Sequence, residues 1–201
     1  MLVSSTGHTV PSLWDKPVGT MNAVDEIFGI LTAKGDRNYD DGESVTQLQH
    51  ALQCAAQAEH AGAGTAMITA ALLHDIGHLI NADARAAIKR KEDAYHENSG
   101  AAFLAQWFDE DVCAPVRHHV PAKRYLTATE ADYFGRLSKG SVRSLEVQGG
   151  PFDAEAAVAF IKQPHAEDGV QLRRWDEEAK DVNAVTPPLE HFRGYVESAL
   201  R

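Results

Sequence analysis

Apolar residues recur at helical spacing along most of the chain. Between Met21 and Lys34 they are three and four positions apart, and Gly35 follows, which predicts an amphipathic helix. The same spacing predicts helices at about residues 44–61, 110–120, 153–163 and 189–200, and an apolar face along 167–182. No useful stretch alternates apolar and polar residues as a strand would. We therefore expect an all-α fold.

A central helix around residues 67–73 is almost entirely apolar, which is typical of a helix buried on most sides. It ends in His74 and Asp75, and we expect Gly77 to stop it. Pro121 is expected to stop the helix at 110–120 in the same way. The charged segment 83–93 reads as a solvated surface element, and residues 122–150 as short helical pieces.

Length and composition favour one domain of a small-molecule enzyme. The chain has 201 residues, which we divide into an N-terminal arm at 1–20 and a domain at 21–201. A net charge of -10 argues against a nucleic-acid partner, because such binding depends on neutralising phosphates. Cys54 and Cys113 form no CxxC pair, and we find neither a signal peptide nor a membrane span. We expect a cytoplasmic protein.

Six side chains that ligate metals stand at or near buried helix faces: His50, His74, Asp75, His96, His119 and Asp176. Burying such groups without partners costs several kcal/mol each, and a shared metal removes that cost. Nitrogen and oxygen ligands without thiolate suit iron or manganese, and six are more than one tetrahedral zinc needs. The set predicts two metals, although the His74–Asp75 pair taken alone is more typical of a structural hydrogen bond. We choose His119 over His118 because it shares an apolar stripe with Val112 and Val116.

The order of these residues, a first His, then His-Asp, two further His and a final Asp, resembles the HD-domain superfamily. The runs at 42–43, 122–126, 141–145, 148–151 and 173–176 are similar to those of small HD-domain mixed-valent di-iron oxygenases that degrade organophosphonates. These are relatives of myo-inositol oxygenase. The resemblance covers about residues 35–182 and implies an HD-domain helical bundle.

The resemblance also implies a cofactor of two Fe ions, Fe(II)/Fe(III), bridged by Asp75, with O2 as cosubstrate. One iron would take His50, His74 and Asp176, and the other His96 and His119. The phosphonate would be held by four further residues: His78, Lys123, Ser141 and Arg173. Taken alone, Lys123 and Arg173 are typical of solvated surface charges, and Ser141 of a helix cap.

Tyr39 and Glu43 would belong to a lid over the substrate. This chain departs from the family pattern there, since a Tyr is expected three residues before Glu43 and position 40 is Asp. Three carboxylates, Asp40, Asp41 and Glu43, would favour a cationic substrate group such as trimethylammonium, with Tyr39 as a cation-π face. The adjacent aspartates are equally typical of a solvated loop.

The function implied is O2-dependent cleavage of the C–P bond of 1-hydroxy-2-(trimethylammonio)ethylphosphonate or 1-hydroxy-2-aminoethylphosphonate. Phosphate and glycine betaine, or glycine, would be released. Lys, Arg, hydroxyl and imidazole donors match the three oxygens of such a small-molecule organophosphonate. The alternatives are an HD-family phosphohydrolase acting on a nucleotide or phosphate ester, and a silent HD module that binds a phosphorylated signal.

Overall fold

Helices form nearly all the regular structure in the computed structural model, which describes residues 22–39, 44–81, 90 and 92–201. Within these ranges there is no strand, and one isolated bridge joins Asn38 to Thr46. The expected all-α fold is confirmed. The arm at 1–20, the lid carboxylates at 40–43 and most of the charged segment at 83–93 lie outside the described residues. None of the helices described is long and apolar enough to cross a membrane.

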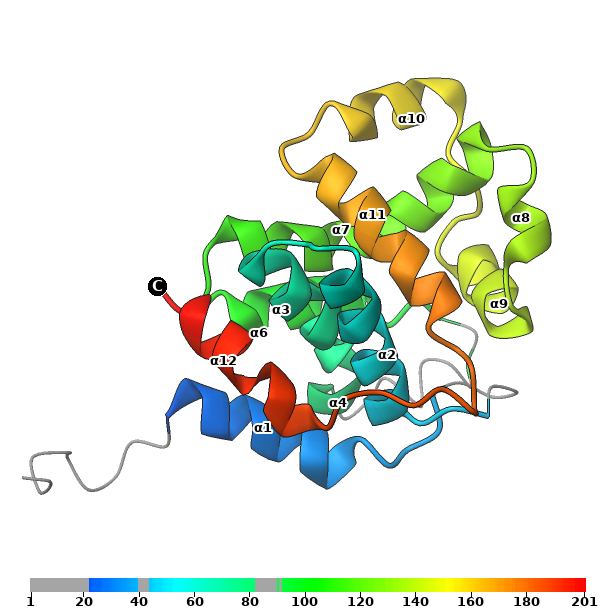
Figure 1. Cartoon of the computed structure of the whole chain (residues 1–201). Coiled ribbons are helices and arrows are strands. Elements are labelled where there is room, and N and C mark those ends of the chain that lie inside the picture. Colours follow the sequence, from blue (N-terminus) through cyan, green and yellow to red (C-terminus); the bar gives the residue numbers. More distant parts are fainter. Residues whose placement is uncertain (1–21, 40–43, 82–89, 91) are drawn as a thin grey trace, which may run out of the picture.

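Figure 1 shows the helices in chain order. They are α1 (Ala23–Lys34), α2 (Gln47–His60), α3 (Thr65–Leu73), α4 (Ile76–Ile80), α6 (His96–Leu104), α7 (Glu110–Thr129), α8 (Tyr133–Arg136), α9 (Lys139–Val147), α10 (Ala154–Ile161), α11 (Ala166–Glu178), the 3-10 helix η1 (Leu189–Phe192) and α12 (Arg193–Ser198). Two helices have side-chain caps at their start: Thr46 and Gln49 make a reciprocal capping box on α2, and Asp153 accepts from the Ala156 N–H on α10.

Helix α3 lies at the centre, in contact with α2, α7, α11 and α12 (Figure 1). Its residues from Ile68 to Leu73 are all buried, as the absence of a polar face predicts. Burying each Leu contributes about 1.5–3 kcal/mol, so this helix anchors the bundle. The residues that directly follow α3 are thereby held at the centre of the molecule.

The expected stop at Gly77 is wrong. Helix α3 ends before His74 and Asp75, and Gly77 lies inside the next helix, α4. Its lack of a side chain serves a close approach instead, because a Cβ at this position would lie 2.0 Å from the carbonyl oxygen of His96. The glycine brings the start of α6 against α4.

The expected stop at Pro121 is also wrong, because α7 passes through both Pro115 and Pro121 and reaches Thr129. Each proline removes one N–H from the helix, but α7 packs along both α6 and α11, and that burial outweighs the lost hydrogen bonds. The continuation has a consequence for the site. Lys123 lies one turn beyond His119 on the same continuous helix.

Candidate metal centre

The structure brings all six expected ligands together at the centre of the bundle. His50 comes from α2, His74 and Asp75 from the α3–α4 junction, His96 from the first turn of α6, His119 from α7 and Asp176 from α11. None of the six is more than 6% exposed. His118, by contrast, points away, and its Nε2 lies 3.2 Å from the Pro164 carbonyl oxygen.

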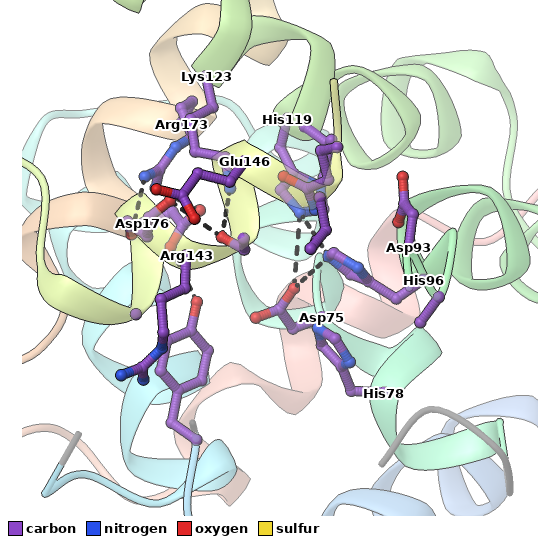
Figure 2. A pocket seen from close by; sticks show the side chains of 18 of the residues that line it. Asp75, His78, Asp93, His96, His119, Lys123, Arg143, Glu146, Arg173 and Asp176 are labelled. Carbon is purple, nitrogen blue, oxygen red and sulfur yellow. Dashed lines mark hydrogen bonds and ion pairs between the residues drawn. The ribbon is translucent and has the colours of Figure 1, made fainter. Parts of the chain in front are cut away.

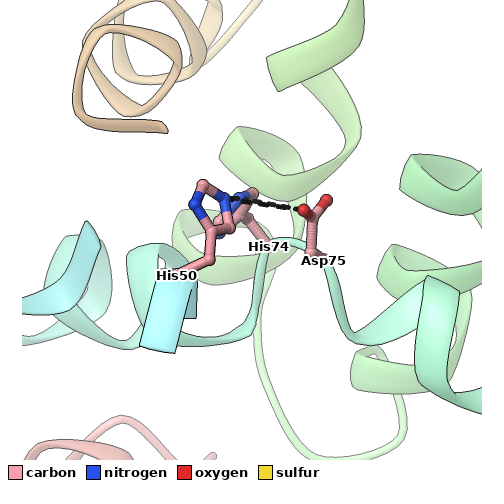
Figure 3. Close-up of side chains that lie close together, drawn as sticks. All are labelled: His50, His74 and Asp75. Atoms are coloured by element: carbon pink, nitrogen blue, oxygen red, sulfur yellow. Dashed lines mark hydrogen bonds and ion pairs between the residues drawn. The ribbon is translucent and has the colours of Figure 1, made fainter. Parts of the chain in front are cut away.

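Two groups of ligand atoms form around one carboxylate. In the first, His50 Nε2 and His74 Nε2 are 3.1 Å apart, and His74 Nε2 lies 3.4 Å from Asp75 Oδ2 (Figure 3). Asp176 Oδ1 completes this side, 3.3 Å from His50 Nε2. The atoms of His50, His74 and Asp75 lie close enough together to serve as ligands of the same ion.

The second group uses the other oxygen of Asp75. His96 Nε2 and His119 Nε2 are 3.0 Å apart, and they lie 3.2 and 3.5 Å from Asp75 Oδ1 (Figure 2). Asp75 therefore stands between two pairs of imidazoles and offers one oxygen to each. This is the arrangement that a carboxylate bridging two ions requires.

The outer ring nitrogens fix the tautomer of three of the histidines. His50 Nδ1 donates to the Ala179 carbonyl (2.8 Å), His74 Nδ1 to Ala71 (2.8 Å) and His119 Nδ1 to Val116 (2.6 Å). A carbonyl oxygen only accepts, so the proton is on Nδ1 and each Nε2 presents a lone pair to the centre.

Unprotonated Nε2 atoms cannot hydrogen-bond to one another, and Asp75 Oδ2 is buried without any hydrogen-bond partner. Lone pairs that converge in this way need a cation. Imidazole nitrogen and carboxylate oxygen without thiolate suit a first-row transition metal. The residues present therefore fit metal ions.

For Asp75, Asp176 and His119 the electrostatics favour the forms that bind metals. Burial raises the pKa of Asp75, but the imidazoles of His74 and His96 outweigh it and hold that pKa well below its usual range. For Asp176, burial is likewise outweighed by the charge of Arg173, and the pKa is well below normal. Burial lowers the pKa of His119, so its ring is neutral.

A cavity of about 550 Å³ opens onto this centre. Asp75, His96 and His119 line one part of it, and the expected phosphonate contacts His78, Lys123, Ser141 and Arg173 line it as well (Figure 2). The His78 ring stacks on His96 at 3.8 Å between ring centroids. Tyr39 also lines the cavity, and its hydroxyl donates to Asp176 Oδ1 at 3.3 Å. Glu43 lies outside the described residues.

The end of the cavity that Lys123 and Arg173 line is cationic and buried. Lys123 is 5% exposed and Arg173 1%, so the reading of these two as solvated surface charges is wrong. Arg173 Nε has no hydrogen-bond partner, whereas Nη1 forms an ion pair with Asp176 Oδ2 at 2.5 Å. Burial, and next the charge of Arg173, lower the pKa of Lys123 to about 7. Ser141 is not the cap of α9, since Ser138 fills that position.

Two further charged residues at this end were not expected. Glu177 and Lys180 lie with their side chains 9% and 8% exposed, close behind Ser141. Their spacing carried a signal, because Lys180 follows Asp176 by four positions and Glu177 follows Arg173 by four, which puts each pair on one helix face.

Comparison with known proteins agrees with this geometry. The family model for the HD domain matches residues 48–161. The chain is 43% identical to the 1-hydroxy-2-(trimethylamino)ethylphosphonate dioxygenase (glycine-betaine-forming) of Leisingera caerulea, over 88% of this chain and 89% of the relative. It is 46% identical to the hydroxymethylphosphonate dioxygenase of Gimesia maris, over 88% of both chains. An uncharacterized protein of Acanthamoeba polyphaga mimivirus is 33% identical over 85% of this chain and 78% of the relative.

Proposed function

The chain belongs to the HD-domain family, and from that premise we propose that it is a di-iron dioxygenase that cleaves the C–P bond of a 1-hydroxyphosphonate. The observation that carries this proposal is the single cavity shared by the Asp75-centred ligand groups and the buried cations Lys123 and Arg173. Such a cavity can hold the carbon beside the metal centre and the phosphonate beside the cations.

The phosphonate is the part of the substrate that these side chains are built to hold. It carries up to two negative charges, and the buried Nε–H of Arg173 has no partner and can donate to one of its oxygens. Lys123 adds a second donor. Burial disfavours its protonated, charged form, and an anion bound beside it favours that form, so Lys123 takes up a proton when the anion binds. His78 and Ser141 complete the set along the same wall.

His50, His74 and Asp176 would hold one iron and His96 and His119 the other, with Asp75 between them. When bound, the iron pair supplies the one-electron chemistry that reaction with O2 requires. The chain's own part is to orient the hydroxylated carbon beside His96 and His119 by holding the phosphonate, and to keep bulk water from the buried centre.

The overall reaction balances without an external reductant. The carbon that carries the hydroxyl loses its bonds to hydrogen and phosphorus and becomes a carboxylate. One oxygen atom of O2 is needed for that carboxylate and the other for phosphate, with one proton released. The organic carbon is oxidised by four electrons, which is the number that O2 accepts.

We favour a cationic substituent on the substrate. The cavity wall includes the carboxylates of Glu92, Asp93 and Glu146, which suit a trimethylammonium or ammonium group. The two curated relatives named above differ at this point, since the name of one contains a trimethylamino group and that of the other does not. The product would be glycine betaine or glycine for the cationic substrates.

The test follows O2 and phosphate together in iron-loaded protein. We expect equal consumption of O2 and release of phosphate, and none under anaerobic conditions. Anaerobic release would instead support the phosphohydrolase. Comparison of kcat/KM for 1-hydroxy-2-(trimethylammonio)ethylphosphonate, its primary amine and hydroxymethylphosphonate tests the substituent, and we expect about a tenfold preference for a cation.

A further inference from the structure

The hydroxyl of Ser141 is held by Arg173 and by two residues to which the proposed function gives no role, Lys180 and Glu177. Ser141 Oγ accepts from Lys180 Nζ at 2.8 Å and from Arg173 Nη2 at 3.3 Å, and it donates to Glu177 Oε2 at 2.8 Å. Its two lone pairs are thus taken by cations. Its O–H bond points to Glu177, and rotation about the Cβ–Oγ bond can turn the proton toward the cavity by giving up the longer accepted contact, from Arg173 Nη2.

Glu177 does not depend on that proton. Its carboxylate also accepts from the Ser138 backbone N–H at 2.7 Å and from Lys180 Nζ at 2.9 Å, and it pairs with Arg173. If the Ser141 hydroxyl turned away, three donors would still satisfy this buried carboxylate. A buried acceptor without a hydrogen bond normally costs free energy, which would oppose such a turn. Glu177 avoids this cost because its other donors remain.

Charge at this end also depends on Lys180. Glu177 places a negative charge behind the two cavity cations, Lys123 and Arg173, and would weaken their hold on an anion. Lys180 offsets that charge from a position that does not line the cavity. Arg173, which also pairs with Asp176, and Lys123 in its protonated form then present positive charge to an anion in the cavity.

We propose that Lys180, together with Glu177, is a positioning residue that holds Ser141 Oγ and leaves its proton free to be donated to a phosphonate oxygen. This inference rests on the proposed function, because it assumes an anion beside Ser141. It assigns Lys180 an effect on the binding of the anion that acts through Ser141. A residue that served only to neutralise Glu177 would instead affect anion binding independently of Ser141.

A double-mutant cycle separates these roles. Methylphosphonate has the anionic group but no hydroxyl, so its binding to full-length, iron-loaded protein can be measured by calorimetry without turnover. We expect Lys180→Met and Ser141→Ala each to weaken binding about tenfold, the value of one hydrogen bond to a charged group. If Lys180 acts through Ser141, the double variant should lose about tenfold to twentyfold rather than the roughly hundredfold of independent sites.

Control variants distinguish the proposed role of Lys180 from a general effect of removing a lysine. Lys162→Met removes an exposed lysine and should leave binding unchanged, and Lys180→Arg should restore most of it. Thermal unfolding is measured in parallel, and the cycle is repeated with Lys180→Gln if the Met variant does not fold. Additive losses, or binding within twofold of wild type in Lys180→Met or Lys180→Gln, would overturn the inference. Failure of the wild-type protein to bind methylphosphonate would instead count against the proposed function.

Discussion

Replacing Gly77 by Ala should remove one metal while leaving the other. The added Cβ would lie 2.0 Å from the His96 carbonyl oxygen and 2.7 Å from the His96 carbonyl carbon. An ordinary C···O contact is about 3.3 Å, so the start of α6 must move by about 1.3 Å. The obstacle is backbone, which cannot rotate away as a side chain would.

The expected cost in the free energy of unfolding is about 1–3 kcal/mol, the usual range for overpacking. For a chain of this length that corresponds to a fall in Tm of about 2–4 °C per kcal/mol. Because His96 begins α6, its ring moves with the backbone, and a displacement of about 1 Å can reduce turnover about a hundredfold. We expect iron to fall from two toward one per chain, with the His50–His74 side retained.

Gly29→Ala is the matched control. A Cβ there meets nothing within 4 Å, the position is exposed on α1, and the change should stabilise the helix by about 0.5–1 kcal/mol with both irons kept. Metal analysis and thermal unfolding of the two variants decide the matter. If Gly77→Ala retained two irons and unfolded within about 0.5 kcal/mol of wild type, the argument from close approach would be refuted.

Two further predictions concern the ligands and the anion site. Asp75→Ala should lose both irons, since each ligand group depends on one of its oxygens, and near-stoichiometric iron in that variant would contradict the bridge. Because burial and Arg173 lower the pKa of Lys123 to about 7, free protein loses this positive charge as the pH rises above 7, and kcat/KM for the phosphonate should fall there. In Lys123→Arg the guanidinium stays charged, so the alkaline fall should disappear from the pH profile; an unchanged profile would assign it to another group.

The helical fold was predictable because its signals are local. The periodicity of apolar residues in α1, α2 and α12, and the cap at Asp153, depend on neighbours in sequence. The two failures, at Gly77 and Pro121, share a cause. Both residues commonly end helices, and both are overruled here by contacts with α6 and α11 that no local pattern reports.

In the candidate site, too, some residues were predictable from the sequence and others were not. His50, His74, Asp75, His96 and His119 could be found because metal ligands must be of a few residue types in a recognisable order. Glu177 and Lys180 could not be distinguished from ordinary surface charges. A charged helix face has the same sequence pattern whether solvent or another part of the chain covers it. Only the packing of α9 against the end of α11 buries them.

The tautomers of His74 and His119 are set by carbonyl oxygens of Ala71 and Val116, three residues earlier on their own helices. A side-chain substitution cannot delete a carbonyl oxygen, so this support for the metal centre survives mutation so long as the helix does. The residues that line the rest of the cavity do not fix the tautomers of the metal ligands. A lineage with this architecture can therefore exchange one phosphonate substituent for another without rebuilding its redox machinery, and the differing names of two relatives at 43% and 46% identity accord with such a history.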